Sequence, residues 1–73
     1  MLVGSNVVFS TEKRKGFIEK QIVGKISKIK GTHFETALYR VKFNREVERY
    51  GKLIGAIWAT YQEIVEKTQS NKD

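Results

Sequence analysis

The fold of this chain depends on residues 24–31, which read GKISKIKG. Ile26 and Ile29 lie three positions apart, a spacing typical of a helix. Both are β-branched, as are the two apolar residues just before Gly24, and such side chains fit a pleated sheet better than a helix. A glycine inside so short a helix would also cost about 1 kcal/mol. We therefore expect a strand over residues 22–30.

A regular strand would place Ile26 and Ile29 on opposite faces of the sheet, because successive side chains alternate. One extra residue near Ser27–Lys28, a β-bulge, returns Ile29 to the inner face. Such a bend also helps a small sheet to close into a barrel. With the bulge in place, the outer face of the strand carries three lysines: Lys25, Lys28 and Lys30.

The clearest strand pattern is ALYRVKF at residues 37–43, which alternates between inner and outer positions. We expect it to form a hairpin with residues 22–30, so that Arg40 and Lys42 share the outer face of the lysines. Its inner face is predicted to carry Ala37, Tyr39, Val41 and Phe43, and the core also to contain Phe9. Further strands are expected at residues 6–10 and 52–58, with a long basic loop at 11–21, a turn region at 31–36 and a charged loop at 44–51.

The C-terminal part of the domain has two interpretations. We favour a turn at residues 59–62 followed by a strand at 63–67. The alternative is a terminal helix from Tyr61, which the capping-box pair Thr60 and Glu63 would start. The first interpretation gives an all-β, five-stranded small barrel, with a short C-terminal helix or 3-10 turn left open.

With 73 residues, the chain is expected to form one small domain over residues 1–68, followed by a flexible tail at 69–73. It contains no cysteine, which excludes disulfides and a cysteine-based zinc site and fits a cytoplasmic location. The N-terminus lacks the pattern of a signal peptide. The longest apolar run, residues 53–59, is too short to cross a bilayer, so we expect no membrane partner.

Positive charge is concentrated in the first part of the chain. The net charge is +6, with +7 over residues 1–45 and −1 over residues 46–73. Such an excess indicates an anionic partner, most commonly nucleic acid, although a solvated surface would also explain it.

Two basic sets and several aromatic residues are therefore candidates for binding. The residues expected to contact a nucleic-acid backbone are Lys25, Lys28, Lys30, Arg40 and Lys42, assisted by Lys13, Arg14 and Lys15 in the long loop. The aromatic residues that could face a ligand are Phe17, Tyr50, Trp58 and Tyr61. An equally good interpretation of Phe17 is an anchor that holds the loop to the core.

No set of residues indicates catalysis. His33 is the only histidine and is expected on a surface turn, so no metal site is predicted. Glu46 and Glu48 are expected to pair with Arg45 and Arg49, which flank them, instead of acting as an acid–base pair. We expect no enzyme activity and no cofactor.

Three stretches together resemble the SH3-like small barrels. They are GSNV at residues 4–7, GKISKI at 24–29 and YRVKF at 39–43. The second stretch resembles the core of the KOW modules of ribosomal proteins and transcription elongation factors. The whole layout is similar to a small photosystem I subunit and to the barrel of nitrile hydratase β chains. The resemblance implies a five-stranded barrel that binds RNA or protein without catalysis.

The sequence thus predicts a non-catalytic binding module, with nucleic acid as the favoured partner. The alternative is a protein-interaction module, such as a small phage or accessory protein that docks on a larger complex. That alternative requires an exposed aromatic patch or an open sheet edge.

Overall fold

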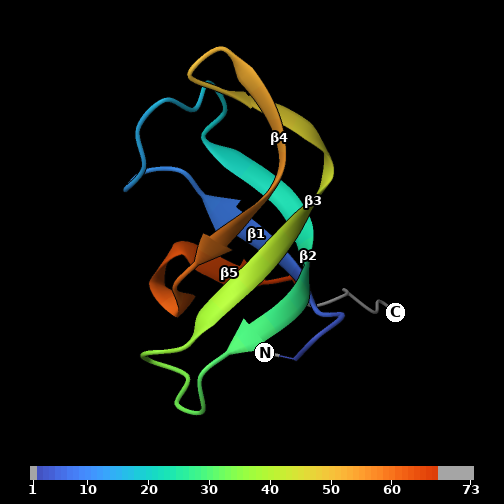
Figure 1. Ribbon diagram of the computed structural model, residues 1–73, viewed down its shortest axis with the longest axis vertical. Coiled ribbons are helices and arrows are strands. Elements are labelled where there is room, and N and C mark those ends of the chain that lie inside the picture. Colours follow the sequence, from blue (N-terminus) through green and yellow to red (C-terminus); the bar gives the residue numbers. More distant parts are fainter. Residues whose placement is uncertain (1, 68–73) are drawn as a thin grey trace, which may run out of the picture.

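Five antiparallel strands form a single sheet in the computed structural model, which describes residues 2–67. The elements are β1 (Asn6–Ser10), β2 (Gln21–Lys30), β3 (Leu38–Arg49), β4 (Lys52–Ala59), the 3-10 helix η1 (Tyr61–Glu63) and β5 (Ile64–Glu66). Their order in the sheet is β4-β3-β2-β1-β5, and the sheet curls around a single core (Figure 1). The predicted five-stranded, all-β fold is confirmed. The predicted tail at 69–73 lies outside the described residues.

The predicted bulge in β2 is present. The pairing of β2 with β3 is regular up to Ile26 and resumes at Lys28, which leaves Ser27 without a partner in register. The Ser27 hydroxyl donates instead to the carbonyl oxygen of Arg40, at 3.2 Å. Because of the extra residue, Ile26 is buried in the core and Ile29 packs against it from the same side. Both the strand and its irregularity are therefore confirmed.

The β3–β4 hairpin differs from the prediction. The charged loop expected at residues 44–51 is wrong, because β3 continues to Arg49 and only Tyr50 and Gly51 form the turn. Their φ angles of 52° and 77° are both positive, as a two-residue type I′ turn requires. Val47, which is 2% exposed, ties this part of β3 to the core. Val47 is the only apolar residue among the charged residues 45–49, so this part of the sequence shows no alternation of apolar and polar residues.

The C-terminal part follows the favoured interpretation. The 3-10 turn that the sequence left open is present as η1, which overlaps the turn predicted at 59–62. β5 is one residue shorter at each end than the strand predicted at 63–67. The alternative, a terminal helix from Tyr61, is wrong. Ile64 lies opposite Phe9 of β1 and is buried with it, so an extended backbone completes the core at this point.

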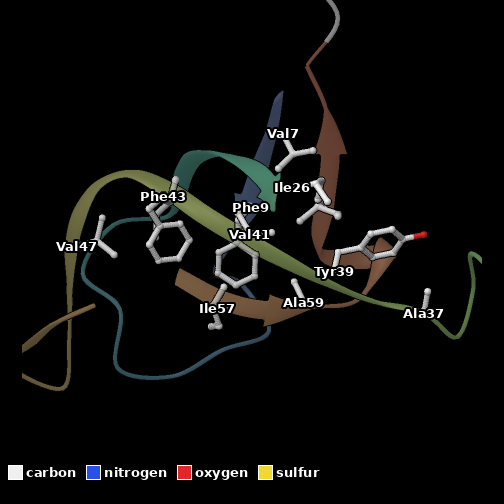
Figure 2. Close-up of a cluster of buried hydrophobic side chains, with 12 residues drawn as sticks. Val7, Phe9, Ile26, Ala37, Tyr39, Val41, Phe43, Val47, Ile57 and Ala59 are labelled. Atoms are coloured by element: carbon white, nitrogen blue, oxygen red, sulfur yellow. The ribbon is translucent and has the colours of Figure 1, made fainter. Parts of the chain in front are cut away.

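The core fills the inner side of the curled sheet (Figure 2). The predicted core aromatics Phe9, Tyr39 and Phe43 are all buried, and the rings of Phe9 and Phe43 lie 6.1 Å apart. The buried apolar set is Val7, Phe9, Ile22, Ile26, Ala37, Tyr39, Val41, Phe43, Val47, Ile57, Ala59 and Ile64. All four residues predicted for the inner face of 37–43 belong to it.

The basic loop between β1 and β2 spans residues 11–20. Phe17 fixes its middle part, because its ring packs edge-on against Phe9 at 5.8 Å and its backbone forms a bridge with Arg49 of β3. The loop therefore lies against the β3–β4 hairpin.

Candidate functional site

Five cations share the outer surface of the β2–β3 hairpin, and we call this surface the basic hairpin face: Lys25, Lys28, Lys30, Arg40 and Lys42. The register places Lys25 directly opposite Lys42 and Lys28 directly opposite Arg40. The four lysines are exposed and Arg40 is half-buried. The predicted outward row of lysines, next to Arg40 and Lys42, is thus present in the structure.

No acidic partner compensates these charges within the described residues. The ion pairs found there are Arg14–Glu63, Arg45–Glu19 and the contact of His33 with Glu35, none of which includes a cation of the basic hairpin face. Like charges directly opposite each other on paired strands are unfavourable. Salt largely screens only charges that lie farther apart than about 8–10 Å, so neighbouring cations on this surface still repel one another and attract an anion.

Trp58 of β4 brings an aromatic ring to the same surface. It lies opposite Arg40 in the β3–β4 register, and its ring has Arg40 at 5.5 Å and Lys30 at 5.9 Å from its centroid. Sequence reasoning selected all three residues but did not place Trp58 next to the cations. That placement depends on a register shift in β3 and β4 between Lys42 and Val47, which no sequence pattern showed.

The second basic set, Lys13, Arg14 and Lys15, lies in the long loop, and two of its members make contacts within the protein. The Arg14 guanidinium donates two hydrogen bonds to the Glu63 carboxylate, at 2.5 and 2.9 Å, and one to the carbonyl oxygen of Trp58, at 2.9 Å. Lys13 contacts the side-chain oxygen of Gln62 at 3.4 Å. A contribution of this set to binding stays a prediction, but Arg14 is already used to hold the loop against β4 and η1.

The Arg14–Glu63 pair shifts the titration of both groups. The hydrogen bonds from Arg14, followed by one from the Thr60 N–H, hold the pKa of the Glu63 carboxyl below its ordinary value, although burial acts the other way. The hydrogen bonds between Arg14 and Glu63 also raise the pKa of Arg14. The capping-box residues recognised in the sequence are thus used, with the Thr60 N–H donating to Glu63 Oε1 at 3.1 Å.

The remaining aromatic candidates lie in different surroundings. Phe17 is half-buried against Phe9, as expected of a loop anchor. Tyr61 packs against the core and meets the ring of Phe34 edge-on at 5.2 Å. Tyr50, at the tip of the β3–β4 hairpin, is 68% exposed.

An open groove of about 700 Å³ runs along β4. Its lining residues are Arg14, Arg40, Arg49, Tyr50, Lys52, Ile54, Ala56, Ile57 and Trp58. It shares Arg40 with the basic hairpin face and is lined by cations, two aromatic residues and aliphatic residues. Sequence reasoning missed this groove because its lining comes from the long loop and from both strands of the hairpin.

The groups considered for chemistry are placed as surface residues. His33 lies in the turn between β2 and β3, exposed, and stacks on the ring of Phe34. Arg45 pairs with Glu19, and the Nε of Arg49 donates to the carbonyl oxygen of Lys15, so their predicted pairing with Glu46 and Glu48 is wrong. Over residues 2–67 no three His, Asp or Glu side chains come together as metal ligands would.

Comparison of the chain with protein-family models, with curated proteins and with solved structures found no match. The resemblance to SH3-like barrels and KOW modules therefore stays a prediction. Within the described part of the chain, no helix has the length and apolar character needed to span a membrane.

Proposed function

We propose that this protein binds nucleic acid through the basic hairpin face, without catalysing a reaction. The observation that supports the proposal is the cross-strand register, which sets Lys25 against Lys42 and Lys28 against Arg40 on one exposed surface. A fold gains nothing from opposing like charges, whereas a phosphate backbone turns the same arrangement into favourable contacts and released counterions. The resemblance to KOW modules, which implies RNA or protein binding, agrees with this proposal, and the absence of cysteine fits a location in the cytoplasm.

Charge reversal at one position of the face tests the proposal. At about 50 mM salt, Lys28→Glu should weaken binding of a labelled RNA or DNA oligonucleotide about tenfold, because it removes one phosphate contact and adds a repulsive charge. Fluorescence anisotropy measures this change. Lys28 is suited to the test because it is exposed and makes no ion pair with a described residue.

Lys20→Glu is the matched control. Lys20 is an exposed lysine of the long loop, and its substitution changes the net charge by the same amount as Lys28→Glu. It should alter the affinity by less than about twofold. Equal losses in the two variants would show that only the net charge matters, and the basic hairpin face would then have no special role.

A second candidate function is protein binding through β4. This strand stands at one end of the sheet order, and Tyr50 and Leu53 beside the hairpin tip are 68% and 65% exposed. An open edge can accept an added strand from a partner. This function predicts a protein partner whose binding survives Lys25→Glu and Lys28→Glu, together with no affinity for nucleic acid at low salt.

A further inference from the structure

The geometry points to single-stranded nucleic acid as the ligand, with a base stacked on Trp58 in the groove along β4. This inference rests on the proposed function and goes further, because it names the form of nucleic acid and the residue on which a base stacks. The basic hairpin face alone would serve a duplex as well as a single strand, since phosphates are present on both.

The lining of the groove defines the chemistry of its ligand. Its apolar lining residues are Ile54, Ala56 and Ile57, and four cations also line it: Arg14, Arg40, Arg49 and Lys52. Among residues 2–67, no acidic residue lines the groove. Such a lining fits a ligand that is both anionic and partly flat and apolar, as a nucleotide is.

Two of the four cations are available for a phosphate. Arg14 is bound to Glu63, and Arg49 lies over the rings of Phe17 and Tyr50 at 4.9 and 5.4 Å. Arg49 also donates to the carbonyl oxygen of Lys15. Arg40 and Lys52, in contrast, make no ion pair with any described residue, although Arg40 lies over the Trp58 ring. The register sets Arg40 opposite Trp58 and Lys52 opposite Arg49, near the two ends of β4, so a strand that follows the groove meets one cation after the other.

Trp58 is held in place before any ligand binds. Its side chain is half-buried, and its carbonyl oxygen accepts a hydrogen bond from Arg14 at 2.9 Å. Lys30 and Arg40 lie over its ring, so a base that stacks there takes the place of a cation on the ring face. A fixed ring loses little conformational entropy on stacking. Base–aromatic stacking, combined with backbone contacts to cations, is the usual means of binding single strands.

Tyr50 is positioned at the other end of the groove by the long loop. Its N–H donates to the carbonyl oxygen of Gly16 at 2.8 Å, and its ring lies directly over that glycine, where a Cβ would come within 2.7 Å of the ring atoms. The loop thereby fixes the position of Tyr50, the second aromatic residue of the groove. Its ring is a second surface on which a neighbouring base can stack.

Stacking in the groove requires a base that is not already stacked in a helix. Duplex bases are covered on both faces, so only an unpaired base can lie on Trp58. Arg40 belongs both to the basic hairpin face and to the groove, so one strand can place its phosphates on the face and a base in the groove. An acidic peptide could also contact the cations, but its carboxylate side chains offer no flat ring to lie on Trp58, which favours nucleic acid.

The test uses the intrinsic fluorescence of Trp58, the only tryptophan of the chain. The full chain is titrated with oligo(dT) of about 12 nucleotides, a duplex of the same length and a glutamate-rich peptide. We expect oligo(dT) to quench the fluorescence and to bind about tenfold more tightly than the duplex. Lys52→Glu should weaken oligo(dT) binding several-fold and leave duplex binding nearly unchanged, whereas the control Lys20→Glu should affect neither.

Stacking itself is tested by Trp58→Leu, read by anisotropy with labelled oligo(dT). We expect at least a tenfold loss, against less than twofold for Phe34→Leu, an exposed aromatic residue that does not line the groove. Circular dichroism confirms that the variants are folded, and Lys52→Glu carries the test should Trp58→Leu unfold the protein.

The possible failures are distinguishable. Equal binding of duplex and oligo(dT) without quenching would overturn the single-strand inference and leave the proposed function standing. Quenching by the peptide alone would overturn it in favour of a protein ligand. No binding of either nucleic acid would overturn both proposals.

Discussion

At the scale of single residues, Gly24 occupies a position in β2 where no side chain fits. A Cβ at this position would come within 2.6 Å of the Lys42 carbonyl oxygen and 3.0 Å of a Val41 methyl carbon. Both neighbours belong to β3, which is paired with β2, so neither can move without disturbing the sheet. We expect Gly24→Ala to lower the free energy of unfolding by about 1–3 kcal/mol, measured by urea denaturation.

Gly55 of β4 provides the matched control. A Cβ there would meet nothing within 4 Å, and the backbone conformation is an ordinary one for any residue. Gly55→Ala should therefore leave the stability within about 0.5 kcal/mol of wild type, or raise it slightly, because alanine restricts the unfolded chain. Equal effects of the two substitutions would contradict the close approach of β2 and β3.

At the scale of elements, Arg14 and Glu63 join the long loop to η1. Glu63 is 7% exposed, and its pKa is lowered chiefly by the hydrogen bonds from Arg14. A carboxyl with a lowered pKa stabilises the fold above the pKa of the unfolded chain, about 4.5. That stabilisation is lost as the pH falls from there through the lower pKa of the folded state.

Glu63→Gln should accordingly cost about 2 kcal/mol at pH 7 and much less near pH 3. Urea denaturation at the two pH values measures this difference. Glu66→Gln, at an exposed carboxylate of β5, is the control and should change the stability little at either pH. The pKa of Glu19 is also lowered, so the pH dependence of wild-type stability does not report on Glu63 alone. The comparison of Glu63→Gln with Glu66→Gln isolates the effect of Glu63. The same cost for Glu63→Gln at both pH values would contradict a stabilising ion pair.

The strands could be predicted where the pattern of apolar residues in the sequence matches the side chains that are buried in the core. The β-branched residues of 22–30 and the odd spacing of Ile29 were enough to predict β2 with its bulge, because only one face of the strand meets the core. The second half of β3 could not be predicted, because Val47 is its only buried residue between Phe43 and the turn. The turn also lacks the usual Asn-Gly signal, with Tyr50 in the left-handed conformation.

At the scale of the whole molecule, the fold gathers charge that the sequence shows only as a regional excess. The five cations of the basic hairpin face could be predicted, because the bulge and the hairpin fix which side chains point outward. The groove along β4 could not, because it depends on how the long loop and the β3–β4 register place Arg14, Tyr50 and Trp58. Local patterns carry no information on such distant contacts.

The central claim, that the basic hairpin face contacts phosphates, is tested most directly by the salt dependence of binding. If all five cations contact phosphates, the log–log slope of affinity against salt should be about −3.5 for a single strand. In Lys25→Glu/Lys28→Glu the slope should become less steep by about 1.4–2, since two contacts are lost. A slope near zero for wild type, or an unchanged slope in the double variant, would contradict the claim.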